Sequence, residues 1–218
     1  AGFVYGLSIA DQFIKTGMYK NVLVIGSEVQ SKLLEKSNRG RNVTVLFGDG
    51  AGAVIVSRTA GENHVLSTHL HADGKDAEEL ALQYPGTGKE GYWITEEMIT
   101  SGDFLPHMNG PLVFKTAVVK FPMVIKEALD ANNLTTDALD LLIPHQANLR
   151  IAEFVQRQLG LRNDQVYNNI QKYGNTTAAS IPIALSEAWE EGKVKDGDLI
   201  CLAAFGSGFV WASALLRW

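Results

Sequence analysis

The chain has 218 residues, of which 46% are hydrophobic and 20% are charged, and its formal net charge is −5. This composition predicts a folded globular protein and argues against bulk attraction to nucleic acid or anionic membranes. No stretch approaches the roughly 20 apolar residues of a membrane span, residues 1–20 lack a signal-peptide pattern, and one cysteine excludes a disulfide framework. We therefore expect a cytoplasmic protein.

Helical and strand patterns alternate through the first third of the sequence. Apolar residues at helical spacing predict a helix over residues 2–18, with Gly17 as a stop signal near its end. Four β-branched or apolar runs bounded by glycine and polar residues predict strands over residues 21–26, 43–47, 51–57 and 65–71. Residues 73–110 have no strong period, which is typical of a functional lid or a surface excursion.

The rest of the chain repeats this alternation. A helical pattern resumes at Val113, but Pro122 inside it is expected to kink or split the helix. Gly160 is expected to end a helix over residues 147–159. The other predicted elements are strands over residues 139–144, 165–168, 198–204 and 209–217 and a helix over residues 177–191.

Two segments of the sequence are similar to each other. Residues 46–58 (LFGDGAGAVIVSR) align with residues 204–217 (AFGSGFVWASALLR), and we interpret each as a strand, a glycine turn and a returning strand. The alignment matches the helix that begins near Ala1 with the helix that begins after Asn175. In the second half, the strands and the helix of residues 139–172 precede the matched helix. Nothing precedes the corresponding helix in the first half, so we expect the chain to start within its first repeat.

Two polar residues stand at the ends of predicted elements. His145 follows an apolar run in LLIPHQAN, at the carboxyl end of a strand, where open α/β sheets build their sites. A packing role and a functional role for His145 are about equally supported. Asn175 follows a glycine and precedes a helix, so its ordinary interpretation is a helix N-cap. A functional role for Asn175 is the alternative that the repeat favours.

Three other candidate sites favour structural interpretations. Cys201 lies in the apolar run LICLAAF, without the helix N-terminus or cation that lowers a thiol pKa, and is predicted to be buried and not a nucleophile. Residues 48–53 (GDGAGA) lack the lysine of a phosphate-binding loop and favour a tight hairpin turn. His69 and His71 share one strand face with Asp73 beyond, but packing is favoured over a metal site because further ligands are not apparent.

Five ordered segments together resemble the β-ketoacyl-acyl-carrier-protein synthase III family of condensing enzymes. They are GDGAGAVIVS, STHLHADG, IPHQANLRI, YGNTTAASIPIAL and AFGSGFVWASALLRW, and the resemblance runs from Ala1 to Trp218. It implies an α/β thiolase-like fold of two pseudo-repeated halves with mostly parallel sheets and helices, the first half incomplete at its N-terminus. Residues 1–105 would be the rest of the first half plus a surface excursion, and residues 106–218 the second half.

The resemblance also implies an activity. Family members move an acyl group from coenzyme A to a cysteine, and malonyl on acyl carrier protein then loses CO2 and attacks the acyl-enzyme. The opening AGF follows the nucleophile in the family, so that cysteine is expected just before Ala1. The resemblance makes His145 and Asn175 hydrogen-bond donors to the malonyl thioester oxygen. It assigns the Ser207 backbone N–H to a second oxyanion hole and Phe205 to the channel wall.

The resemblance extends to substrates and partners. Arg39, Arg150 and Phe205 would bind substrate, and Lys115, Arg150 and Arg157 would receive the acidic carrier protein. Ordinary solvated surface charge is an equal alternative for each basic residue. Coenzyme A enters as a thioester substrate, and no cofactor, metal, nucleic acid or membrane is expected. We expect a homodimer.

Two alternative functions remain open. One is a related thiolase-superfamily enzyme that condenses acyl-CoA donors, which would use the same His145 and Asn175. The other is a non-catalytic scaffold or inactive fragment, because these residues contain no candidate nucleophile. We accordingly expect the 218-residue chain alone to be inactive.

Overall fold

The computed structural model describes residues 1–84 and 94–218. The main elements, in chain order, are α1 (Gly2–Lys15), β1 (Asn21–Glu28), β2 (Gly50–Ser57), β3 (Val65–Ala72), α4 (Gly110–Asp130), β6 (Leu141–Pro144), α5 (Leu149–Leu159), α7 (Ser180–Glu190), β7 (Leu199–Gly206) and β8 (Val210–Arg217). The short elements are α2 (Arg41–Thr44), η1 (Gly74–Glu79), β4 (Leu80–Ala81), α3 (Glu96–Ser101), β5 (His107–Met108), η2 (Thr136–Ala138), η3 (Asn163–Gln165), α6 (Ile170–Tyr173) and η4 (Thr177–Ala179).

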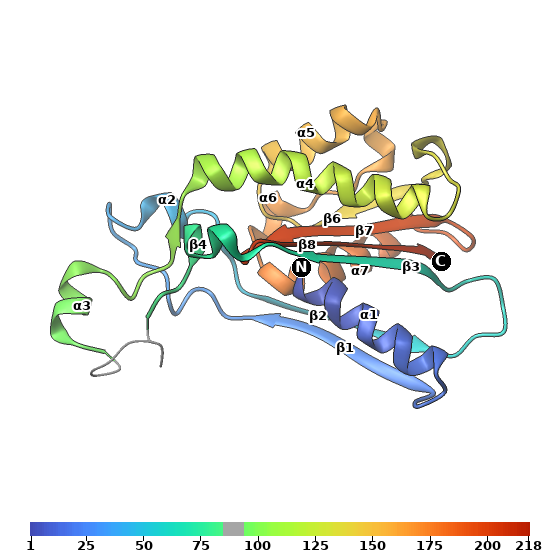
Figure 1. Ribbon diagram of the computed structural model, residues 1–218, viewed down its shortest axis with the longest axis horizontal. Coiled ribbons are helices and arrows are strands. Elements are labelled where there is room, and N and C mark those ends of the chain that lie inside the picture. Colours follow the sequence, from blue (N-terminus) through green and yellow to red (C-terminus); the bar gives the residue numbers. More distant parts are fainter. Residues whose placement is uncertain (85–93) are drawn as a thin grey trace.

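Helices and sheets form alternating layers (Figure 1). Helices α4 and α5 cover one face of a four-stranded sheet, and α1 and α7 cover the other. The two-stranded sheet of β1 and β2 lies beyond α1 and α7. The α/β class expected from the sequence is confirmed.

The direction of the strands differs from the mostly parallel arrangement that the resemblance implied. The four-stranded sheet has the order β3–β8–β7–β6, in which only the β6–β7 pair is parallel. The β1–β2 pair and the β4–β5 pair are also antiparallel. Strands β7 and β8 are joined by a short turn, and such a connection reverses the chain and makes the two strands antiparallel.

Strand β7 lies at the centre of the core because both of its faces are covered. Ile200 and Leu202 pack in the cluster that includes α1 and α7, whereas Leu199 and Cys201 pack in the cluster that includes α4 and α5. Successive side chains of a strand point to opposite faces, so a strand buried on both faces is apolar throughout. Cys201 is fully buried, which confirms the expectation from its sequence context.

Three predicted elements are wrong. Residues 43–47 were expected to form a strand, but they contain the end of α2 and a turn, so residues 48–53 are not a hairpin turn and instead lead into β2. Pro122 does not split α4, which is continuous over 21 residues, and the kink expected as the alternative stays a prediction. Residues 165–168 form only an isolated bridge between Val166 and Leu142, after the short helix η3.

The repeat is visible as two helix–strand–strand units. In each unit a helix is followed by two antiparallel strands, α1–β1–β2 in the first and α7–β7–β8 in the second. The strand that precedes β2 is therefore β1, not the expected run at residues 43–47. Strand β3, from the first of the two expected halves, pairs with β8 of the second. The division at residue 105 stays a prediction.

The outer surface of the β1–β2 sheet carries apolar side chains. Leu23, Ile25 and Ile55 are 58%, 60% and 70% exposed, whereas Val24 on the inner face of β1 is buried. Within residues 1–84 and 94–218, every helix is too short or too polar to cross a membrane.

Candidate active site

His145 and Asn175 line one narrow cavity of about 120 Å³. Phe205, at the end of β7, lines the same cavity, and the channel-wall role that the resemblance implies for it stays a prediction. Most of the remaining wall is apolar and includes Phe114 and Phe121 of α4. The cavity therefore combines an apolar wall with two polar side chains from segments distant in the sequence, an arrangement typical of small-molecule sites.

His145 is held at the end of β6 by the central sheet. Its backbone N–H donates to the Ala203 carbonyl over 2.8 Å, which continues the parallel β6–β7 ladder. Its ring Nδ1 lies 2.6 Å from Ser180 Oγ. Burial lowers the pKa of His145 from 6.5 to about 3. The imidazole is consequently neutral at physiological pH and can donate a hydrogen bond from one ring nitrogen.

Asn175 is fixed by backbone contacts with the segment ahead of β2. Its N–H donates to the Leu46 carbonyl over 2.7 Å, and its carbonyl accepts from Gly48 N–H over 3.0 Å. Its side-chain Oδ1 accepts from Thr177 N–H over 2.9 Å. This contact belongs to a tight turn before η4, so Asn175 is not the N-cap of α7, whose N-cap is Ala179. With Oδ1 engaged, the Nδ2 amide group remains as the donor.

The turn that orients Asn175 contains a strained residue. Thr177 has a φ of +47°, in the left-handed region that β-branched residues disfavour. Its Oγ1 is buried and has no hydrogen-bond partner among the described residues. Such strain persists only where the surrounding structure holds the backbone in place, and here it accompanies the contact that orients the Asn175 amide.

The N-terminus of α1 points toward this cavity. A Cβ placed on Gly206, which lines the cavity, would lie 3.8 Å from the Ala1 nitrogen. Because a helix N-terminus carries unpaired N–H groups and a partial positive charge, it stabilises an anion or a thiolate placed there.

Ser207 lies at the rim of this region. It is exposed in the turn between β7 and β8, and its hydroxyl donates to the Leu80 carbonyl. Gly206 and Leu80 line the cavity, and Ser207 does not. The role expected for the Ser207 backbone N–H stays a prediction.

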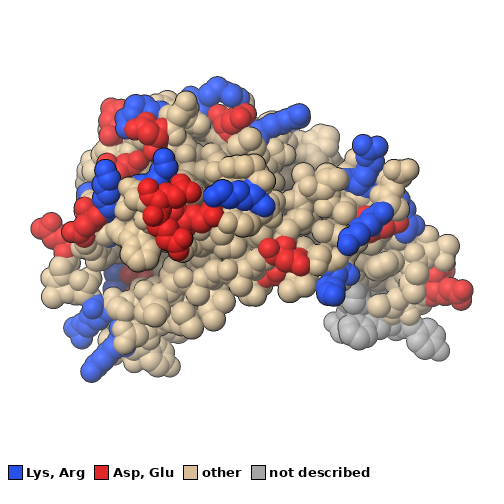
Figure 2. Space-filling model, turned by 180° about the vertical axis from the view of Figure 1, so that it is seen from behind, with Lys and Arg blue, Asp and Glu red and all other residues tan. Residues whose placement is uncertain are grey.

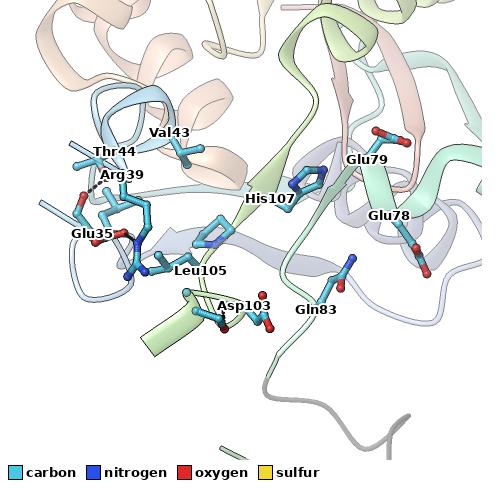
Figure 3. A pocket seen from close by; sticks show the side chains of 15 residues that line it. Glu35, Arg39, Val43, Thr44, Glu78, Glu79, Gln83, Asp103, Leu105 and His107 are labelled. Atoms are coloured by element: carbon cyan, nitrogen blue, oxygen red, sulfur yellow. Dashed lines mark hydrogen bonds and ion pairs between the residues drawn. The ribbon is translucent and has the colours of Figure 1, made fainter. Parts of the chain in front are cut away.

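Arg39 lines a second cavity of about 420 Å³ (Figure 3). Its Nε lies 2.8 Å from a Glu35 carboxylate oxygen, and its Nη1 donates to the Thr100 carbonyl over 2.9 Å. Figure 3 shows Arg39 and Glu35 on one side of this cavity and Glu79 and His107 on the other. The structure thus places Arg39 apart from the His145 cavity and engages its guanidinium with a carboxylate.

A short two-stranded ribbon separates the two cavities. In the β4–β5 pair, Leu80 lies opposite Met108, and both residues line the His145 cavity. The neighbouring His107 lines the Arg39 cavity. Because successive side chains of a strand point to opposite faces, the two cavities lie on the two sides of this ribbon.

The three residues expected to receive the carrier protein are all exposed on the α4–α5 layer. Lys115 is on α4, and Arg150 and Arg157 are on α5. Phe114 and Phe154 pack edge to face between these helices, with ring centroids 6.5 Å apart. None of the three basic side chains forms an ion pair with a described residue. Figure 2 shows lysine and arginine side chains interspersed with aspartate and glutamate along this edge of the molecule.

His69 and His71 contact a carboxylate in the structure. His71 Nε2 and His69 Nδ1 lie 2.7 Å and 3.4 Å from the two oxygens of Glu127, and the His71 ring stacks on Trp211. Across the described ranges, His, Cys, Asp and Glu side chains form no group of three suited to a metal ion. These contacts agree with the packing interpretation of the two histidines.

Sequence reasoning missed Ser180 and Gln146 as residues that support the site. Gln146 is 3% exposed, and its Nε2 donates to the Pro144 and Tyr167 carbonyls, while its Oε1 accepts from Asn169 N–H and Ile170 N–H. It thereby ties the end of β6 to the segment that leads to Asn175. A polar residue between a strand end and a helix was a visible signal for Gln146, whereas Ser180 reaches His145 only through the folded chain.

The α/β architecture of the chain is that of the thiolase-like fold. A family model of 3-oxoacyl-[acyl-carrier-protein] synthase III matches residues 1–74. A second model, of the C-terminal part of the same enzyme, matches residues 129–218. Proteins named β-ketoacyl-[acyl-carrier-protein] synthase III from Caldanaerobacter subterraneus subsp. tengcongensis and Yersinia enterocolitica are 45% and 46% identical over the whole chain. The chain belongs to the β-ketoacyl-acyl-carrier-protein synthase III family.

Solved structures agree with this assignment. The 3-oxoacyl-[acyl-carrier-protein] synthase III of Aquifex aeolicus is 43% identical with a TM-score of 0.88, and that of Thermus thermophilus is 37% identical with a TM-score of 0.88. Each of the two structures aligns with the whole of this chain. The chain in turn spans 64% of the Aquifex aeolicus protein and 65% of the Thermus thermophilus protein. The chain likewise spans 64% of the length of the two curated relatives.

Proposed function

We propose that the protein is a β-ketoacyl-acyl-carrier-protein synthase III, which condenses an acyl-CoA primer with malonyl acyl carrier protein. The observation that carries this proposal is the presence of His145 and Asn175 in one cavity, each with one side-chain atom already engaged by a neighbour. The family of the chain supports it. Nothing in the comparisons favours the alternatives of a scaffold or an inactive chain.

The proposed chemistry places negative charge on the malonyl thioester oxygen. The bond to the malonyl carboxylate breaks, CO2 leaves, and the electron pair forms an enolate. The Asn175 amide and the imidazole N–H of His145 would donate to that oxygen, and donors fixed in advance stabilise such charge without reorganising. The enolate carbon would then bond to the acyl carbonyl carbon while the carbon–sulfur bond to the acceptor breaks.

The acyl acceptor is the least complete part of the site. Cys201 is the single cysteine of the 218 residues, and burial in the core raises its pKa to about 12. The acceptor that the resemblance implies, a cysteine just before Ala1, stays a prediction. The orientation of α1 supports it, because a thiol at that helix N-terminus would have a lowered pKa.

Substrates would approach along two routes. The α4–α5 surface with Lys115, Arg150 and Arg157 is our proposed docking surface for an acidic carrier protein, because its basic side chains are exposed and unpaired within the described structure. We assign coenzyme A, as a thioester substrate, to Arg39 in the neighbouring cavity, with Arg150 as a second contact. Binding there would require Arg39 to exchange its Glu35 partner for an anionic group of the substrate. The homodimer and the cytoplasmic location also stay predictions.

A condensation assay tests the proposed function. The protein, purified as its cell produces it, is incubated with radiolabelled acetyl-CoA and malonyl acyl carrier protein. The CO2 released and the 3-oxoacyl carrier protein formed are then quantified. We expect one CO2 for each product, and little product when malonyl-CoA replaces malonyl carrier protein. Equal rates with both malonyl donors would instead support the related acyl-CoA-condensing enzyme, and no product with either would contradict a condensing function.

A further inference from the structure

The ring nitrogen of His145 that faces away from the cavity has a buried hydroxyl as its partner. Nδ1 lies 2.6 Å from Ser180 Oγ. Ser180 is 2% exposed and is the first residue of α7. Because this contact occupies Nδ1, Nε2 is the ring nitrogen that remains for a ligand in the cavity.

The direction of the proton in this contact follows from the other partner of Ser180. The backbone N–H of Gln146 lies 3.3 Å from Ser180 Oγ and can only donate, so the hydroxyl oxygen accepts there. Ser180 Oγ has no third polar contact with any described residue. A buried hydroxyl proton rarely remains unpaired, so it donates to His145 Nδ1. Nδ1 then carries a lone pair, and the proton of the neutral ring is on Nε2.

We propose that Ser180 is a positioning residue that holds His145 in the tautomer with its proton on Nε2. The contribution to condensation rests on the proposed function, whereas the tautomer itself does not. In the opposite tautomer, an Nε2 lone pair would face the negatively charged thioester oxygen and repel it. Ser180 would thus decide whether His145 stabilises or opposes the enolate.

The position of Ser180 at the start of a helix reinforces this selection. The first turn of α7 has a partial positive charge, which opposes a second proton on the ring. The Ser180 hydroxyl can donate only to an Nδ1 that carries a lone pair, so the direction assigned to this contact requires a neutral imidazole.

The tautomer can be measured without turnover. In protein labelled with 15N-histidine, ring nitrogen shifts distinguish protonated from unprotonated nitrogens, and the signals that disappear in His145→Gln identify His145. We expect an unprotonated Nδ1 and a protonated Nε2 at pH 7. Ser180→Ala should shift the ring toward a mixture of tautomers, and Ser180→Thr, which keeps the hydroxyl, should restore the wild-type shifts. The exposed Ser186 of α7 provides the matched control, Ser186→Ala, with no change expected.

Kinetics supply the second readout. We expect Ser180→Ala to lower kcat for condensation roughly tenfold, equivalent to one lost hydrogen bond, with KM for malonyl carrier protein nearly unchanged. A protonated Nδ1 in the wild type, or unchanged ring signals in Ser180→Ala, would overturn the proposal. The expected tautomer in a protein that does not condense malonyl carrier protein would overturn the proposed function and leave the tautomer assignment standing.

Discussion

The backbones of Phe47 and Asn175 form an isolated parallel bridge that joins the two halves of the chain at the His145 cavity. The bridge consists of the contacts of Asn175 with the Leu46 carbonyl and the Gly48 N–H. The position of the Asn175 amide therefore depends on a segment that carries no candidate catalytic side chain.

Gly48→Ala should disturb Asn175 through this bridge. A Cβ on Gly48 would lie 2.0 Å from the Tyr173 carbonyl oxygen, so the segment before Asn175 must move. We expect a loss of roughly 1–3 kcal/mol in the free energy of unfolding, measured by urea denaturation, together with slower condensation. Gly74→Ala is the control, because a Cβ there meets no atom within 4 Å. Equal stability of the two variants would contradict the tight approach at Gly48.

His145→Ala and Asn175→Ala should affect the two partial reactions unequally. Because the two donors are assigned to the malonyl thioester, each substitution should lower condensation by about 10²- to 10³-fold and leave acyl transfer from acetyl-CoA much less affected. Single-turnover labelling of the protein by radiolabelled acetyl-CoA measures the first step, and CO2 release measures the second. Equal losses in both steps would argue against this division of roles.

Charge reversal on the α4–α5 surface should weaken carrier-protein binding selectively. We expect Arg150→Glu or Arg157→Glu to raise the KM for malonyl carrier protein roughly three- to tenfold, with an effect that shrinks as salt is added. The rate of acylation by acetyl-CoA is the internal comparison for Arg157→Glu, since Arg157 is assigned to docking alone. Lys20→Glu, an exposed site in the α1–β1 connection, is the control. A salt-independent KM in the wild type would mark the surface as ordinary solvated charge.

The stability of the protein should depend on the ionisation of His145. Its pKa is about 3 in the folded protein and 6.5 ordinarily, so below pH 6.5 the unfolded state binds a proton that the folded state does not. The free energy of unfolding should therefore fall as the pH is lowered from about 6.5 toward 3, by roughly 1 kcal/mol per pH unit, and this contribution should be fully present above pH 6.5. His145→Gln should lack this component, and parallel pH curves for the two proteins would disprove the assignment.

Cys201 should be dispensable for acyl transfer. Its thiol is fully buried, and desolvation raises its pKa to about 12, so thiolate is scarce at neutral pH. We expect Cys201→Ala to be labelled by radiolabelled acetyl-CoA as the wild type is, at a cost in stability of about 1 kcal/mol from the lost core volume. Mass spectrometry of the labelled peptide identifies the acceptor, and label on Cys201 would make it the nucleophile after all.

The sequence predicted elements correctly where local composition decides the structure, and wrongly where a contact with a distant segment decides it. Strands β7 and β8 were predictable because they are buried on both faces and are therefore apolar throughout. The run at residues 43–47 (VTVLF) is also rich in apolar and β-branched residues, yet the Leu46 carbonyl bonds to Asn175 N–H instead of a neighbouring strand. Local propensity does not contain that long-range contact.

The split expected at Pro122 is absent for a related reason. A proline inside a helix costs about 3 kcal/mol, but Phe121, Val124 and Ile125 around it are at most 2% exposed and pack in the core beneath α4. Burial of three large side chains contributes about 1.5–3 kcal/mol each and outweighs that cost.

For the site, His145 was recognisable from its strand end and Asn175 from its turn. The Ser180 contact with His145 was not, because it forms only when α7 packs against the end of β6.

The pairing of β3 with β8 bears on how the protein is synthesised. Strand β8 lies between β3 and β7 in the described part of the chain, so the β3–β8 pairing cannot form until residues 210–217 have been made. At typical elongation rates the interval between the two strands is on the order of ten seconds. Until then, the edge of β3 that pairs with β8 lacks this partner. Pairing of β3 with β8 is thus a late event of translation.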